Sequence, residues 1–92
     1  MKILVLNGPN LNMIGIREKG IYGSRSYADI VGYLKEEGTK RGHEIEVLQS
    51  NYEGQIIEWL QKAYFEHYDG VIINPGAFTH YSYALHDAIK AI

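Results

Sequence analysis

The sequence contains no cysteine among its 92 residues. Disulfide bonds and thiolate metal sites are therefore excluded, and cysteine usage gives no information about the redox compartment. The histidines show no HExxH or comparable spacing, so no metal site is expected from them. Phosphate loops of the GxGxxG or GxxxxGKS/T type and the GxSxG nucleophile motif are also missing. The sequence thus gives no support to metal-dependent, nucleotide-dependent or serine-nucleophile chemistry.

The sequence also lacks a strong charge of either sign, since its formal net charge is −2. There is therefore no electrostatic case for binding nucleic acid or an anionic membrane. No apolar run approaches the length of a transmembrane helix, and no basic and then apolar leader opens the sequence. These observations predict a cytoplasmic protein and give no reason to expect nucleic acid or a membrane as its partner.

The most informative stretch is the opening of the chain. Residues 3–6 are consecutive aliphatic residues, too few for an amphipathic helix but typical of a strand buried on both faces of a parallel sheet. The turn formers Asn7, Gly8, Pro9 and Asn10 follow directly. Because open α/β sheets bind ligands at the carboxyl ends of their strands, this turn is a candidate site. A simple strand end without a ligand is the alternative interpretation.

The next part of the chain combines a loop, a helix and a second strand. Residues 13–23 are rich in glycine and charge without a period, which indicates a long mobile loop of the kind that often binds ligands. Ser26 followed by Asp29 is typical of a helix start, and Gly42 of a helix end. A second strand is expected at residues 43–49. The apolar face of the helix consists of Tyr27, Ile30, Val31 and Leu34.

The last part of the chain repeats the alternation. A second helix is expected to open at Ser50 and Asn51, with Trp59 packing at the edge of its apolar stripe. The stripe consists of Ile56, Ile57, Leu60, Ala63 and Tyr64. Residues 70–73 predict a third strand buried on both faces, and residues 74–80 a polar turn. The face of the final helix consists of Ala84, Leu85, Ala88, Ile89 and Ile92.

The order βαβαβα predicts a single α/β domain with a parallel sheet. The turns after the first and third strands then emerge at the same end of the sheet. Asn10, the loop from Arg17 to Tyr22 and the turn at residues 74–80 are expected to converge there, with Asp87 nearby on the final helix. Their amides, guanidinium, phenol and imidazole suit an oxygen-rich small molecule and proton transfer.

Several segments of the chain resemble the type II 3-dehydroquinate dehydratases. They are NGPNLN at residues 7–12, Arg17-Glu18 with Tyr22-Gly23, Gln49-Ser50-Asn51, and INPGAFTHYS at residues 73–82. The resemblance covers the whole chain in order. It implies a flavodoxin-like fold, here a parallel sheet in spatial order 2-1-3 with helices on both faces. It also implies conversion of 3-dehydroquinate to 3-dehydroshikimate by anti elimination through an enolate, in the shikimate pathway of aromatic amino acid biosynthesis, without metal, Schiff base or cofactor.

The resemblance also implies roles for individual residues. Tyr22 matches the proton acceptor, Arg17 the arginine that activates it, and Asn10 an asparagine that orients water and the enolate. Substrate-binding positions are matched by Asn74, His80 and Asp87. Because the position of Asp87 typically acts near a subunit boundary, a homo-oligomer is implied, and family members form trimer-based dodecamers. His86 stands where relatives often carry arginine and is interpreted as a surface or packing residue.

The resemblance further implies that relatives continue for two more strands and their helices, which carry a general-acid histidine, a cradle for the substrate carboxylate and a closing arginine. Domain 1–92 is therefore expected to be incomplete at its C-terminus relative to the family, with little turnover of its own. Two alternatives stay open: a catalytically silent half-domain that self-associates, and a flavodoxin-type module that binds phosphate or flavin. Pro9 argues against the second because it has no N–H group to offer a phosphate.

Overall fold

A computed structural model describes residues 1–16 and 25–92 and shows a parallel sheet in the order β2-β1-β3. The strands are β1 (Lys2–Asn7), β2 (Glu44–Gln49) and β3 (Gly70–Asn74). Both neighbours of β1 run parallel to it, and Leu6 pairs with Leu48 on one side and Ile73 on the other. The predicted strand order and the α/β fold class are confirmed.

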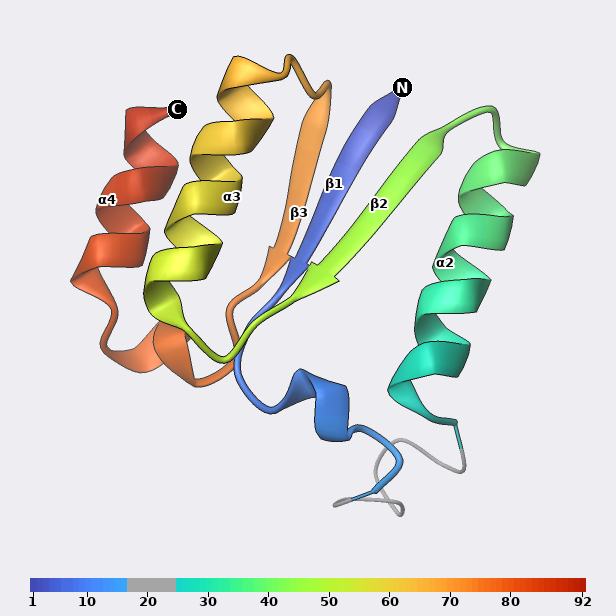
Figure 1. Cartoon of the computed structure of the whole chain (residues 1–92), viewed down its shortest axis with the longest axis horizontal. Helices are drawn as coiled ribbons and strands as arrows, with labels where there is room; N and C mark the ends of the chain where they lie inside the picture. Colours follow the sequence, from blue (N-terminus) through green and yellow to red (C-terminus); the bar gives the residue numbers. More distant parts are fainter. Residues whose placement is uncertain (17–24) are drawn as a thin grey trace.

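Among the described residues, α-helices lie between successive strands and one more follows β3, together with two short 3-10 helices. They are η1 (Leu11–Met13), α2 (Tyr27–Lys40), α3 (Glu53–Phe65), η2 (Gly76–His80) and α4 (Tyr83–Ala91). Figure 1 shows α2 on one side of the sheet and α3 and α4 on the other, with all three strand arrowheads pointing to the same end. The two 3-10 helices and the first turns of all three α-helices gather at that end. Chain connections leaving the carboxyl ends of parallel strands are thereby brought together.

The main core lies between the sheet and α3. Leu4 and Leu6 of β1 are fully buried there, and Leu48 of β2 packs against the same cluster. The cluster also includes Ile56, Leu60, Ala63, Phe78, Leu85 and Ala88. Two residues before Leu48, Glu46 Oε1 accepts a hydrogen bond of 2.9 Å from Lys62 Nζ of α3. This hydrogen bond lowers the pKa of the Glu46 carboxyl. Alternate residues of β2 therefore face α3, as the period of a strand requires.

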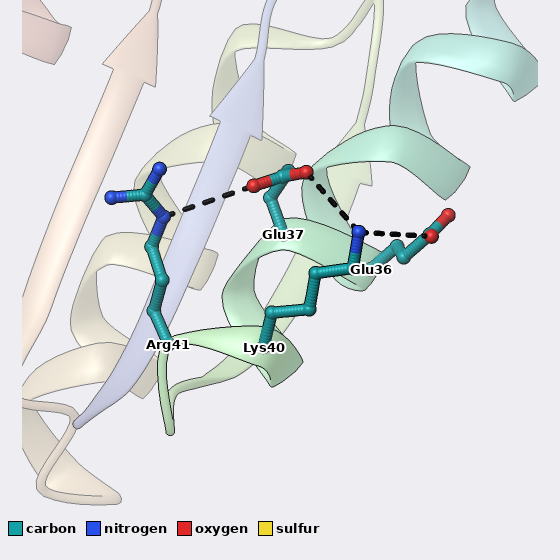
Figure 2. Close-up of polar contacts among 4 residues, drawn as sticks. All are labelled: Glu36, Glu37, Lys40 and Arg41. Atoms are coloured by element: carbon teal, nitrogen blue, oxygen red, sulfur yellow. Dashed lines mark ion pairs between the residues drawn. The ribbon is translucent and has the colours of Figure 1, made fainter.

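The other face of the sheet carries α2. The helix begins as predicted, because Ser26 Oγ accepts from the Asp29 amide and Asp29 Oδ2 accepts from the Ser26 amide. Near its C-terminal end, Lys40 Nζ lies 3.4 Å from Glu36 Oε1, and Arg41 Nε lies 3.8 Å from Glu37 Oε2 (Figure 2). These ion pairs are largely exposed and add little stability. The helix is therefore held mainly by its packing against β2.

Two expectations for α3 are corrected by the structure. The helix begins at Glu53 rather than at Ser50, because Ser50 Oγ instead accepts from the amide of Tyr52 in the preceding turn. Tyr64 is 61% exposed and does not belong to the buried stripe, since it lies beside Phe65 at the far end of the helix. Trp59 packs against the core cluster, as expected.

The region around β3 also departs from the sequence expectation. Residues 70–73 were expected to be buried on both faces, but Ile72 is 59% exposed, because it points away from the core cluster and α2 covers β2 rather than β3 on that face. On α4 only Leu85 and Ala88 are buried, whereas Ala84, Ile89 and Ile92 are exposed. The helix turns a narrower apolar face toward α3 than its sequence pattern predicted.

A pair of glycines in α2 tests how closely this helix lies on the sheet. A Cβ added at Gly38 would stand 2.2 Å from Ile45 Cγ1, whereas nothing lies within 4 Å of a Cβ at Gly32. Gly38→Ala should therefore lower the free energy of unfolding by about 1–3 kcal/mol, because it overpacks the contact. Gly32→Ala should raise that free energy by about 0.5–1 kcal/mol, because alanine is the better helix former. Urea unfolding of both variants measures the difference, and a stabilising Gly38→Ala would contradict the observed helix–sheet spacing.

Candidate active site

The turns after β1 and β3 are bonded directly to each other. The Gly8 amide donates to the Asn74 carbonyl at 2.8 Å, and Asn74 Oδ1 accepts from the Gly76 amide at 3.2 Å. The approach is so close that a Cβ at Gly8 would lie 2.4 Å from the Pro75 carbonyl oxygen. Glycine is therefore needed at position 8 because two backbones meet there. The predicted adjacency of these two turns is confirmed.

The turn after β2 braces the turn that carries Asn10. Asn51 Oδ1 accepts from the Asn10 amide at 3.0 Å and from Gln49 Nε2 at 3.1 Å. Gln49 Nε2 also donates to the Gly8 carbonyl at 3.1 Å. Asn10 has a φ of 67°, in the left-handed region that asparagine tolerates better than most residues. The QSN segment thus holds the backbone of Asn10, a function that its place in the sequence did not indicate.

His80 lies at the end of η2, a segment that is anchored in the core. Phe78 is only 8% exposed, and its carbonyl accepts from the Ser82 amide at 2.9 Å. His80 itself is exposed on a shallow hollow of about 250 Å³. The hollow is lined by Thr79, His80, Tyr81, Ser82, Tyr83 and His86. His86, interpreted above as a surface or packing residue, therefore shares a surface with a predicted substrate-binding residue.

The remaining predicted residues are placed less completely. Asp87 is exposed on α4 and does not line the hollow at His80. Arg17 and Tyr22 lie outside the described residues. The described residues on either side of them are close together, since a Cβ at Gly15 would stand 2.5 Å from the Arg25 carbonyl oxygen. Among the described residues, the structure therefore joins the turns of Asn10 and Asn74, and it places His80 on a hollow that Asp87 does not line.

The first residue of α2 is also tied to this end of the sheet. Asn7 Nδ2 donates to the Tyr27 hydroxyl at 3.2 Å, from the last residue of β1 to the first of α2. The start of α2, three residues after the stretch 17–24, is thereby held beside the turn of Asn10. This contact links the point where the chain enters α2 to the candidate site.

Four backbone amides of the site turns already donate to oxygens within the protein. Those of Gly8, Leu11 and Gly76 donate to protein oxygens, as does that of Asn10. A phosphate site of the flavodoxin type needs such amides to point at the ligand. The observed bonding therefore disfavours the phosphate- or flavin-binding alternative. The side chains available at the site, amides and an imidazole, suit hydrogen bonding to an oxygen-rich molecule.

Over residues 1–16 and 25–92, the structure contains neither a cluster of metal-ligating side chains nor a membrane-spanning helix. In these ranges no three histidine, aspartate or glutamate side chains stand close enough together to hold a metal ion. Within the same part of the chain, no helix is both long and apolar enough to cross a bilayer.

Comparisons with known proteins agree with these motifs. The family model described as dehydroquinase class II matches residues 1–92. The chain is 74% identical over 92 residues to a 3-dehydroquinate dehydratase of Clostridium beijerinckii, and 61% identical to one of Clostridium acetobutylicum. In each case it is covered fully but spans only 63% of the relative's length.

Solved structures give the same result. The crystal structure of type II dehydroquinase from Butyrivibrio crossotus superimposes with a TM-score of 0.95 at 55% identity, over 99% of this chain and 63% of that one. The type II dehydroquinase from Propionibacterium acnes superimposes with a TM-score of 0.90 at 41% identity, over 96% of this chain and 60% of that one. With its sequence, its fold and its paired site turns in agreement, the chain belongs to the class II dehydroquinase family.

Proposed function

We propose that this chain supplies part of the active site of an enzyme that converts 3-dehydroquinate to 3-dehydroshikimate. The observation that carries the proposal is the bonded pair of turns at the strand ends, in which the NGPNLN and NPGAFTHYS segments meet at Gly8 and Asn74. The relatives that match this chain over its full length at 74% and 61% identity are named 3-dehydroquinate dehydratases. Because the chain spans 63% of their length, the remainder of the active site is assigned to residues that those relatives carry beyond the matched part.

The proposed reaction is an anti elimination through an enolate. The Tyr22 phenolate removes a proton from the carbon next to the ketone, and the electron pair of that C–H bond moves onto the carbonyl oxygen. Asn10 orients a water molecule and the enolate that results. The enolate then collapses and expels the hydroxyl group, which leaves as water after taking a proton from a general acid. That acid is assigned to the part of the relatives that this chain does not match.

Arg17 is assigned the activation of Tyr22. A free tyrosine titrates near pH ~10, so acting as a base near neutral pH requires a shift worth about 4 kcal/mol. A guanidinium about 4 Å away supplies roughly that much at an effective dielectric constant of ~20. The pairing of these two residues is therefore sufficient in magnitude for the proposed chemistry.

Substrate binding is assigned to Asn74, His80 and Asp87. Asn74 already has a structural role, since its carbonyl and its Oδ1 hold Gly8 and Gly76. Its Nδ2 is therefore the group assigned to the substrate. His80 offers a ring nitrogen at the end of the turn after β3. Asp87 acts at a boundary between subunits of a homo-oligomer. The enzyme is proposed to work in the cytoplasm and to need no cofactor.

A second candidate function is a catalytically silent half-domain that self-associates. The observation that favours it is the exposure of apolar side chains along β3 and α4, where Ile72 is 59%, Ile89 44% and Ile92 45% exposed. Exposed apolar side chains of this kind are costly in water and favour association. Size-exclusion chromatography separates this candidate from the first only when turnover is measured on the same sample.

The proposed function is tested by extending the chain. The 92 residues joined to the remaining segment of the Clostridium beijerinckii relative should turn over 3-dehydroquinate, followed by the ultraviolet absorbance of the conjugated product. The 92 residues alone should be slower by about 10²–10⁴-fold, because they lack the general acid. The added segment alone is the control. An inactive extended protein would contradict the proposed function, and equal rates for the two would contradict the assignment of the acid.

Asn10 allows its side chain and its backbone to be tested separately. In the extended protein, Asn10→Gly should keep the fold, because glycine accepts the left-handed conformation, but should lower kcat by about tenfold or more through loss of the amide. Asn10→Ala should show the same loss of kcat together with a lower thermal midpoint, because alanine is strained at a φ of 67°. Full activity of a folded Asn10→Gly protein would exclude the proposed contact with the enolate.

Tyr22 is tested by removing only its hydroxyl. In the extended protein, Tyr22→Phe should lower kcat by about 10²–10⁴-fold with substrate binding retained, since a general base contributes on that scale. Tyr64→Phe is the matched control, because Tyr64 is exposed near the C-terminal end of α3 and far from the strand ends. The measurement is steady-state kcat and KM for both variants. A Tyr22→Phe protein that keeps half of its rate would remove Tyr22 from the mechanism.

A further inference from the structure

One side-chain hydrogen bond joins the first turns of two helices at the site. Ser82 Oγ donates to Glu53 Oε2, across 29 positions of sequence. Glu53 is the first residue of α3, and Ser82 is the N-cap of α4. The same Ser82 hydroxyl oxygen accepts from the Leu85 amide at 3.0 Å. A single hydroxyl therefore both caps α4 and ties it to the glutamate.

Ser82 also ends the segment that carries His80. The upstream end of that segment is fixed by Phe78, which is buried in the core and accepts the Ser82 amide on its carbonyl. The downstream end is fixed at the Ser82 side chain by Glu53. His80 lies between these two anchors and is itself exposed. The direction in which His80 faces therefore depends on where Ser82 is held.

The Glu53 carboxylate is well suited to holding the Ser82 hydroxyl in place. A hydroxyl bonded to an ionised acceptor makes a stronger hydrogen bond than one bonded to a neutral acceptor. Glu53 stands in the first turn of α3, and its partner caps α4, so the positive ends of two helix dipoles favour its negative charge. Glu53 also follows the 49–51 turn that holds Asn10. The Glu53–Ser82 bond thus connects the turn after β2 to the turn after β3.

We propose that Glu53 is a positioning residue that sets the orientation of His80 through Ser82. The proposal rests on the proposed function, in which His80 binds the substrate. Glu53 does not touch the substrate in this scheme. Loss of the Glu53–Ser82 bond should therefore weaken substrate binding more than it slows the chemical step, because His80 contributes to ground-state binding.

The test uses the extended protein described above, four variants of Glu53 and Ser82, and one control variant. Glu53→Ala removes the acceptor, and Ser82→Asp keeps a capping oxygen for the Leu85 amide but cannot donate to Glu53 and repels it. Both should raise KM about tenfold or more, with kcat changed less than threefold. Glu53→Gln and Ser82→Thr retain an acceptor and a hydroxyl, so KM should stay within about threefold of the parent. Glu58→Ala is the matched control, since Glu58 is exposed on the same helix.

A second measurement reports on His80 without turnover. The carbon–proton NMR signals of the His80 ring should shift in Glu53→Ala and Ser82→Asp but not in Glu58→Ala. A purely structural bond would lower the thermal midpoint without moving KM or the ring signals selectively. If the unmutated extended protein shows no turnover, the proposed function is refuted. The His80 ring signals then test by themselves whether Glu53 positions His80. Unchanged ring signals of His80 would overturn the role of Glu53. An unchanged KM in an active protein would do the same. If Glu53→Ala does not fold, the ring signals and KM of Ser82→Asp decide between these outcomes.

Discussion

The close approach of two backbones at Gly8 is the constraint on which the candidate site depends. The Gly8 amide reaches the Asn74 carbonyl at 2.8 Å only because position 8 has no Cβ to meet the Pro75 carbonyl. This contact continues the β1–β3 ladder one residue beyond the strand pairing, which ends at Asn7 and Asn74. The turns after β1 and β3 thus continue the hydrogen bonding of the sheet, so the pairing of the two strands also sets which residues of the turns lie opposite each other.

Two further ties convert this contact into a closed arrangement of three turns. Asn51 joins the turn after β2 to the backbone of Asn10, and Glu53 joins the same region to Ser82 after η2. With Gly8 and Asn74 as the third side, each turn is bonded to the other two. An arrangement of this kind resists the displacement of any single turn, which is what a site built on loops requires if its side chains are to be held in place.

The sequence was sufficient to predict the parts of this arrangement that depend on local chemistry. The strand at residues 3–6, the Ser26 cap and the meeting of the turns after β1 and β3 follow from apolar runs, capping residues and the rules for parallel sheets. The Glu53–Ser82 bond was not predictable, because its partners lie 29 positions apart and each is also an ordinary helix-start residue. The exposure of Tyr64 was missed because a helical period places a residue on a face but does not say how far the neighbouring element extends.

The same limit explains Ile72 and points to an asymmetry in the molecule. An apolar run predicts burial on both faces, but burial needs a second layer, and within the described chain α2 lies against β2 rather than over β3. Ile72 is therefore exposed on one face, while Val71 and Ile73 pack on the core cluster on the other. The turn that carries Asn10 is consequently supported by strands on both sides of β1, whereas the turn that carries His80 grows from an edge strand. A side-chain tie such as Glu53–Ser82 matters most on that less supported side, because there the sheet itself supplies only one neighbour.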